Sequence, residues 1–163
     1  MKSLIECTKY ICKILNNHDI EYLIIGGTAV AIHGYIRLST APDGSILGKH
    51  DLDIWYNPTY ENYFKLLKAL KELGFERDFM DEKRPDPNKS FFKHEFEDYK
   101  LDFLPQIIGL NKFKEAYKKK FVVNLDGVEF AIISYDDLIT TKKYSNREKD
   151  KIDIEMLRKN KSE

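Results

Sequence analysis

A short apolar run that stops at two adjacent glycines constrains the fold of this chain more than any other feature. Residues Tyr22–Ile25 are strand formers, and Gly26 and Gly27 follow them directly. The next segment, residues 28–33, is predicted to be a helix that begins at the glycines and ends at Gly34. A strand that passes into a helix through a glycine turn is typical of chains that combine a sheet with helices.

Further helices are predicted from apolar positions that recur at helical spacing. They are expected at residues 3–17, 60–73 and 111–119, and two more lie between residues 135 and 158, with Ser134 as the N-cap of the first. The helix at residues 60–73 is strongly amphipathic, and its inward face is expected to consist of Tyr63, Phe64, Leu67 and Leu70.

Strands are predicted from short runs of alternating or β-branched residues. They are expected at residues 51–56, 75–80, 91–97, 100–104, 121–125 and 128–133. The last two flank Asp126 and Gly127, a pair that favours a type I′ hairpin. We therefore predict an α/β (α+β) fold, in which helices flank one mixed β-sheet. Residues 1–163 should form a single domain, with a core at about 1–133 and a C-terminal helical part at about 134–160.

The composition is that of an ordinary soluble protein. The 163 residues include 27 basic and 27 acidic side chains, so the net charge implies no polyanion as a partner. Cys7 and Cys12 are not expected to form a disulfide across one helix, and two cysteines favour a reducing, cytoplasmic location. No run approaches about 18 consecutive apolar residues, so no membrane span is expected.

Two acids in a predicted strand are the first candidates for chemistry. Asp51 and Asp53 are separated by Leu52, so their side chains should point to one face, about 6 to 7 Å apart along the strand. Like charges at this spacing repel unless a cation lies between them, and Mg²⁺ prefers carboxylate oxygens. The alternative is an exposed strand end with two solvated acids, which is the commoner case for an isolated Asp-x-Asp.

A third acid, Asp102, lies between apolar residues in another predicted strand. If this strand neighbours the first, the carboxylates of Asp51, Asp53 and Asp102 converge, which is the arrangement that a two-metal phosphoryl-transfer site needs. Asp102 would then lie on the acceptor side, where it could take the proton of an attacking hydroxyl.

The glycine turn provides a second candidate feature. Gly26 and Gly27 allow the backbone to approach a ligand closely, and the helix that follows presents free N–H groups to an anion. Thr28 could add a hydroxyl donor. Glycines also form ordinary tight turns, so this motif gains meaning only together with the acids.

Taken together, these motifs resemble the core of the DNA polymerase beta-like nucleotidyltransferase superfamily. The resemblance rests on Gly26-Gly27-Thr28-Ala29, His33-Gly34, Arg37, Asp51-Leu52-Asp53 and the later Asp102. The C-terminal part, with Asp136-Asp137-Leu138-Ile139, Lys142 and Arg147-x-Lys149-Asp150-x-x-Asp153, is similar to the small bacterial branch that includes abortive-infection toxins and lincosamide-modifying enzymes.

The resemblance implies a reaction and a set of roles. A nucleoside monophosphate would move from a nucleoside triphosphate to an acceptor hydroxyl or phosphate, with release of pyrophosphate. Asp51 and Asp53, completed by Asp102, would hold two Mg²⁺ ions, and the turn at Gly26, Gly27 and Thr28 would cradle the phosphates. Arg37 and Lys142 would neutralise phosphate charge. One departure is the segment 40–48, which separates Arg37 from the acids further than in many relatives.

The acceptor stays open at this point. RNA, a protein side chain and a small hydroxylated molecule are all compatible with the motifs, and a homodimer could supply a missing wall of the site. The competing function is a non-catalytic nucleotide-binding protein, or a toxin–antitoxin component that acts through a partner. The presence of all three acids argues for the enzyme.

Several other residues have an ordinary structural explanation beside a functional one. His33 could contact substrate or pack at a helix end, and His50 could support Asp51. Lys142 could lie on a solvated helix face instead of at a phosphate. The remaining candidates are Asp150 and Asp153, which could pair with Arg147 or Lys149, and Trp55 and Tyr56, for which core packing is favoured.

Overall fold

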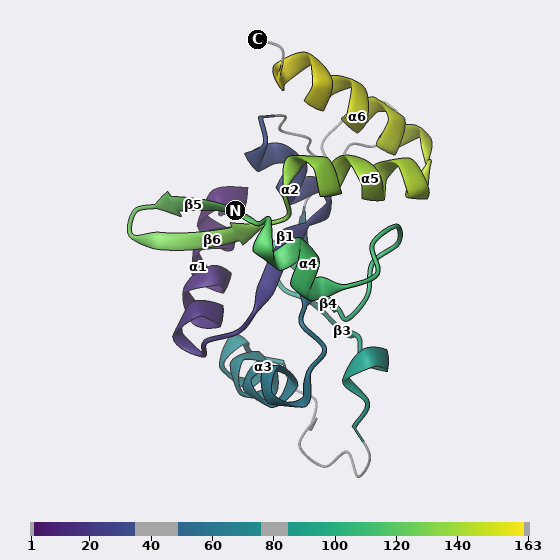
Figure 1. Cartoon of the computed structure of the whole chain (residues 1–163). Coiled ribbons are helices and arrows are strands. Elements are labelled where there is room, and N and C mark those ends of the chain that lie inside the picture. The colour runs from purple at the N-terminus through teal and green to yellow at the C-terminus, as the bar shows by residue number, and fades with distance from the viewer. Residues whose placement is uncertain (1, 35–48, 76–84, 162–163) are drawn as a thin grey trace.

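The computed structural model describes residues 2–34, 49–75 and 85–161 (Figure 1). Arg37 and the segment 40–48 lie outside the described residues. So does most of the strand predicted at residues 75–80.

The described chain forms a mixed sheet flanked by helices, as the sequence predicts. The helices are α1 (Leu4–Asn17), α2 (Gly26–Ile32), α3 (Tyr60–Leu73), α4 (Phe113–Lys118), α5 (Tyr135–Ser145) and α6 (Glu148–Lys161), with a 3₁₀ turn at Pro87–Lys89. The strands are β1 (Tyr22–Ile25), β2 (His50–Tyr56), β3 (Phe92–Glu95), β4 (Tyr99–Leu104), β5 (Phe121–Leu125) and β6 (Val128–Ile132).

Local sequence signals set several of the element ends. The Ser3 hydroxyl accepts from the Glu6 amide and the Glu6 side chain accepts from the Ser3 amide, so a complete capping box begins α1. Ser134 caps α5 in the predicted way, by accepting from the Asp137 amide. Asp126 and Gly127 both have positive φ, +52° and +83°, as a type I′ turn requires, and they join β5 to β6.

The strand order β3-β4-β2-β1-β6-β5 places β2 near the middle of the sheet. Strand β2 pairs antiparallel with β1 and parallel with β4, and β3 closes one edge by pairing antiparallel with β4. Residues directly opposite each other in such pairs share a face of the sheet, so the register determines which side chains meet.

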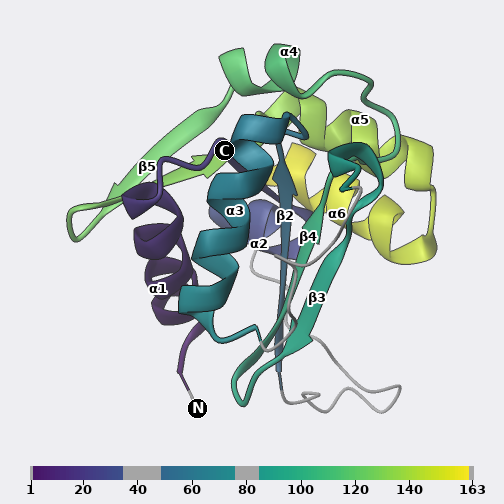
Figure 2. The same ribbon diagram turned by 90° about the horizontal axis from the view of Figure 1, so that it is seen from below.

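One face of the sheet is packed against α1 and α3, which lie side by side (Figure 2). Leu52 and Ile54 of β2 are each 2% exposed and face this layer, as predicted. The prediction for α3 was wrong at Phe64, which is 47% exposed, whereas Leu66 is buried. Successive helix positions are about 100° apart, so Phe64 lies on the flank of the stripe centred on Tyr63 and Leu67.

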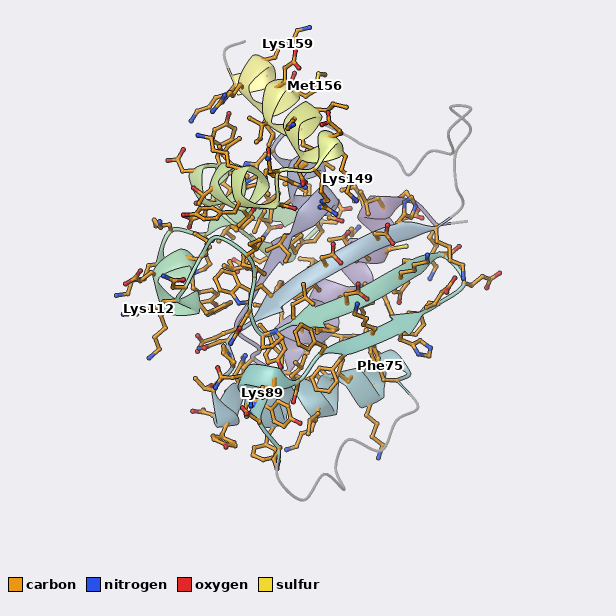
Figure 3. All side chains as sticks on the ribbon, turned by 90° about the vertical axis from the view of Figure 1, so that its right-hand side faces the viewer. Phe75, Lys89, Lys112, Lys149, Met156 and Lys159 are labelled. Carbon is orange, nitrogen blue, oxygen red and sulfur yellow. The ribbon has the colours of Figure 1, made fainter. Side chains whose placement is uncertain are left out.

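The opposite face is covered only in part by the described helices. Helix α2 contacts β1, β2 and α5, and Phe113 of α4 packs edge-on against Trp55, with ring centroids 5.1 Å apart. Figure 3 looks onto the remainder of this face, where β2, β4 and β3 lie in front and α6 lies above them. The predicted acids are on this part of the sheet.

Two further expectations bear on the class of protein. Cys7 and Cys12 are both buried and both free, as predicted. Among the described helices, none is both long and apolar enough to cross a membrane.

Candidate active site

The pairing of β2 with β4 brings the predicted acids together. Asp53 lies directly opposite Asp102 in the parallel register, so the two carboxyl groups share a face. Asp51 lies two residues before Asp53 on the same strand and face, about 6 to 7 Å away by the strand rise. The condition set by the sequence, that the strand of Asp102 should neighbour the strand of Asp51 and Asp53, is therefore met.

The glycine turn lies against the same carboxylate. Strand β1 pairs with β2 so that Ile25 is opposite Asp53, and Gly26 follows as the first residue of α2. Gly26 has φ +66°, and a Cβ at this position would lie 2.7 Å from Oδ2 of Asp53. Glycine is required here both by the backbone conformation and by the space that Asp53 occupies.

Burial and mutual repulsion make Asp53 hard to ionise. Desolvation is the largest cause, and the charges of Asp102 and Asp51 add to it, so the pKa of Asp53 rises to about 6. Lys142 and Lys149 oppose the rise through their positive charges. The pKa of Asp102 is also raised, first by desolvation, although Lys93 acts against it.

This donor set fits a hard divalent cation that brings some of its own ligands. The described residues contain no group of three His, Cys, Asp or Glu side chains that could hold one metal ion by themselves. Mg²⁺ is commonly held by only one or two carboxylates, with water and substrate phosphates as the other ligands. The neighbouring carboxyls of Asp53 and Asp102, with Asp51 on the same face, can supply that share, and their mutual repulsion is the strain a cation would relieve.

Thr28 does not point its hydroxyl toward the acids. Its Oγ1 donates to the backbone carbonyl of Asp51 at 3.2 Å, and the residue is 1% exposed. The expected extra donor for a phosphate is thus already used inside the protein, where it holds the start of α2 against β2.

Lys142 lies in the protein interior, so the alternative of a solvated helix face is wrong for it, and its phosphate role stays a prediction. The residue is 5% exposed, and its Nζ lies 3.3 Å from Asp150 and 3.1 Å from Asp153, whose side chains are fully buried. Arg147 completes the cluster through Nε at 2.8 Å and Nη2 at 3.2 Å from Asp150, which confirms the expected pairing of these two residues.

Two cations beside this cluster were not assigned to the site from the sequence. Arg147 and Lys149 follow the left-handed Asn146 that ends α5, and both side chains are exposed. The charge of Lys149 lowers the pKa of Asp53. The pKa of Arg147 is raised first by its hydrogen bond to Asp150 and to a small extent by the charge of Asp53, so the turn between α5 and α6 lies within electrostatic reach of the acids (Figure 3). The sequence shows the Arg147-x-Lys149 motif, but the position of these side chains relative to the acids depends on how α5 packs against α6.

Known proteins resemble this chain in structure but not detectably in sequence. No family model and no curated protein matches the sequence. The crystal structure of the lincosamide antibiotic adenylyltransferase LnuA, with lincomycin bound, has a TM-score of 0.56 and 19% identity, covering 91% of this chain and 92% of that one. A nucleotidyltransferase-like antigenic protein from Paracoccidioides brasiliensis has a TM-score of 0.56 and 14% identity, over 93% of this chain and 73% of that chain. This chain has the nucleotidyltransferase fold.

A third structure, ANT(2")-Ia in complex with adenylyl-2"-tobramycin, has a TM-score of 0.47 and 18% identity, over 90% of this chain and 82% of that chain. The two structures with a TM-score of 0.56 confirm the resemblance deduced from the motifs at the level of the nucleotidyltransferase fold.

The remaining candidates have structural roles in this nucleotidyltransferase fold. His33 donates a hydrogen bond of 2.8 Å from Nε2 to the Ile133 carbonyl and stacks on Phe121, which is the packing alternative. His50 contacts the Lys2 carbonyl at 3.1 Å through Nε2. Trp55 is 1% exposed and donates to the Pro105 carbonyl, so it belongs to the core.

The contact between Gly26 and Asp53 predicts that a single methyl group disrupts the site. Gly26→Ala should reduce the free energy of unfolding more than Gly127→Ala does, because both positions have positive φ but a Cβ at Gly127 meets nothing within 4 Å. The control should lose about 1 to 2 kcal/mol from backbone strain alone. Urea denaturation of both variants measures the difference, and equal losses would contradict the close approach.

The buried ion cluster predicts a large loss on removing its cation. Lys142→Met removes the buried ammonium that Asp150 and Asp153 share and should lower the free energy of unfolding by about 3 to 5 kcal/mol. The exposed neighbour provides the control, since Lys143→Met should change it by less than about 0.5 kcal/mol. Chemical denaturation at pH 7 compares the two, and a similar small effect in both variants would show that the cluster contributes nothing.

The same experiment has a defined pH dependence. Burial alone would raise the pKa of the Asp150 carboxyl, but hydrogen bonds from Arg147 outweigh it and hold the pKa below its usual range. The stability from this group is therefore complete above the unfolded pKa of about 3.9 and is lost as the pH falls below it. In Lys142→Met the loss should shrink toward low pH, because protonation of Asp150 removes the charge that Lys142 balances.

Proposed function

We propose that this chain is a metal-dependent nucleotidyltransferase that moves a nucleoside monophosphate from a nucleoside triphosphate to an acceptor hydroxyl or phosphate. One observation carries the proposal. In a nucleotidyltransferase fold, the Asp53 carboxylate lies beside Asp102 on one side and against the backbone of the Gly26 turn on the other. The candidate metal ligands and the candidate phosphate cradle are thus in contact.

The acids divide the work of the transfer. Asp51 and Asp53, with Asp102, would hold Mg²⁺, two ions being the expected number, which would supply charge stabilisation for the phosphates and a lowered pKa for the acceptor hydroxyl. The acceptor oxygen attacks the α-phosphorus, the bond from that phosphorus to the bridging oxygen breaks, and pyrophosphate leaves. The proton of the attacking hydroxyl passes to Asp102, which lies on the acceptor side beside Asp53.

The triphosphate would lie on the α2 side of Asp53. Helix α2 has no side-chain cap at its N-terminus, so the first N–H groups near Gly26 and Gly27 remain for phosphate oxygens. Among the described cations, Lys149 and Arg147 suit charge neutralisation better than Lys142, since both are exposed. Arg37 keeps its proposed phosphate role from the sequence.

Several classes of molecule are proposed as acceptors to be tested. LnuA is a lincosamide adenylyltransferase solved with lincomycin bound, which supports including small antibiotics in the panel. RNA and protein side chains belong in it as well, and a homodimer or a toxin–antitoxin pair would extend the same site. A nucleotide-binding protein without turnover is the competing outcome.

Replacing the acids tests the reaction. Asp53→Asn, Asp51→Asn and Asp102→Asn should each reduce label transfer from triphosphate and pyrophosphate release by at least about 100-fold, because each removes charge from the reacting centre. Asp126→Asn is the matched control, an exposed acid in the β5–β6 turn. Each labelled triphosphate is incubated with Mg²⁺ and with total RNA, the chain itself, aminoglycosides or lincosamides. Full activity in all three variants would reject the site, and triphosphate binding without transfer would favour the non-catalytic protein.

Replacing Lys149 tests its proposed contribution to triphosphate binding. Lys149→Met is expected to weaken Mg²⁺-dependent triphosphate binding by about 10-fold, because the residue is exposed and its charge acts on Asp53. Lys151→Met, an exposed lysine on the same helix, is the control. Isothermal titration calorimetry with a non-hydrolysable ATP analogue measures the affinity. Unchanged affinity in Lys149→Met would remove this residue from the phosphate side.

A further inference from the structure

A lysine, Lys93, lies beside the three acids on the side opposite the glycine turn. Strand β3 is the edge strand beyond β4, and Lys93 lies directly opposite Asp102, which lies directly opposite Asp53. These three residues therefore form one row across a single face of the sheet. In the order of the strands, Gly26 at the end of β1 lies on one side of Asp53, and Asp102 followed by Lys93 lies on the other.

A second lysine occupies the next row. Lys100 lies opposite Asp51 on one side and opposite Glu95 on the other, so these side chains also share the face. Glu95 is matched by Lys49, whose Nζ is 2.9 Å from its Oε1. Lys93 and Lys100 are both exposed, and both act on Asp102 by lowering its pKa. Because Lys49 neutralises Glu95, the charges of Lys93 and Lys100 are left without a described acid to balance them other than Asp51, Asp53 and Asp102.

This charge lies where an acceptor has to approach. The triphosphate is proposed to lie on the glycine side, so an acceptor whose hydroxyl reaches Asp102 enters from the side of β4 and β3. An anionic acceptor meets repulsion from the triphosphate, and Lys93 and Lys100 offset that repulsion. A polycationic acceptor would bring its charge against two ammonium groups.

We propose that Lys93, supported by Lys100, selects an acceptor that carries an anionic group, a phosphate or a carboxylate, close to the hydroxyl that is modified. The inference rests on the proposed nucleotidyltransferase function, and it names the chemical class of the acceptor. It excludes polycationic acceptors such as aminoglycosides from the productive set.

Three matched probes test this selection. Glycerol 3-phosphate, glycerol and serinol share one small hydroxylated skeleton and differ in charge, being anionic, neutral and cationic. Each is titrated into the ¹⁵N-labelled full chain, with and without Mg²⁺ and a non-hydrolysable ATP analogue. The backbone amides of Lys93 and Asp102 report binding on the acceptor side, and those of Gly26 and Gly27 report binding of the analogue.

Glycerol 3-phosphate should bind at β3 and β4 at least about 10-fold more tightly than the other two probes. Lys93→Glu should reverse the preference toward serinol, and Lys93→Arg should retain the original order. Lys13→Glu, an exposed lysine on α1, should change nothing. If Lys93→Glu fails to fold, the double variant Lys93→Gln, Lys100→Gln should lose the preference without reversing it.

Each outcome has a defined meaning. If serinol binds at β3 and β4 as tightly as glycerol 3-phosphate, or if changing Lys93 leaves the order unchanged, the inference is overturned. A lysine that only stabilises the strand pair would alter the unfolding free energy and leave the order of the probes unaffected, which also overturns it. If the ATP analogue does not shift the amide resonances of Gly26 and Gly27, the proposed function is contradicted instead. The titrations without nucleotide still report whether Lys93 selects among the probes.

Discussion

The close approach of the Asp53 carboxylate to the Gly26 backbone is the constraint around which the rest of this structure is arranged. It requires that β1 end where β2 carries its second acid, and that α2 start without a side chain at that point. Parallel pairing with β4 then adds Asp102. Because all three strands lie in the middle of the sheet and are packed against α1 and α3 on the other face, the charges rest on a rigid support.

Much of this arrangement follows from local sequence patterns. The alternation in β2 determined that Leu52 and Ile54 face the core while the acids face away, and Asp126-Gly127 and Ser134 marked a hairpin and a helix start correctly. Features that depend on contacts between distant segments were not accessible in this way. The burial of Lys142 arises only when α6 brings Asp150 and Asp153 against α5. The engaged hydroxyl of Thr28 likewise depends on a strand 23 residues away.

The lysines of the C-terminal helices illustrate how one residue type serves two purposes. Lys142 is enclosed by two carboxylates and joins α5 to α6, where desolvation makes any loss of a partner costly. Lys149, near the start of α6, is exposed, and its charge lowers the pKa of Asp53. The cluster of Lys142, Asp150 and Asp153 fixes α6 against α5 and thereby positions Lys149. Helices α5 and α6 therefore contribute to the candidate site as well as covering the sheet.

The alternation of β2 also ties the chemistry to the folding of the chain. Acids and core residues occupy alternate positions of one short strand, so a slip of one residue against β1 or β4 would exchange them. Carboxylates would then enter the layer beneath α1 and α3, and leucine and isoleucine would face the glycine turn. A molecule with a misplaced reacting centre would therefore also lack a stable interior. The strand pairing that aligns the three acids is therefore the same pairing that gives the chain its hydrophobic core.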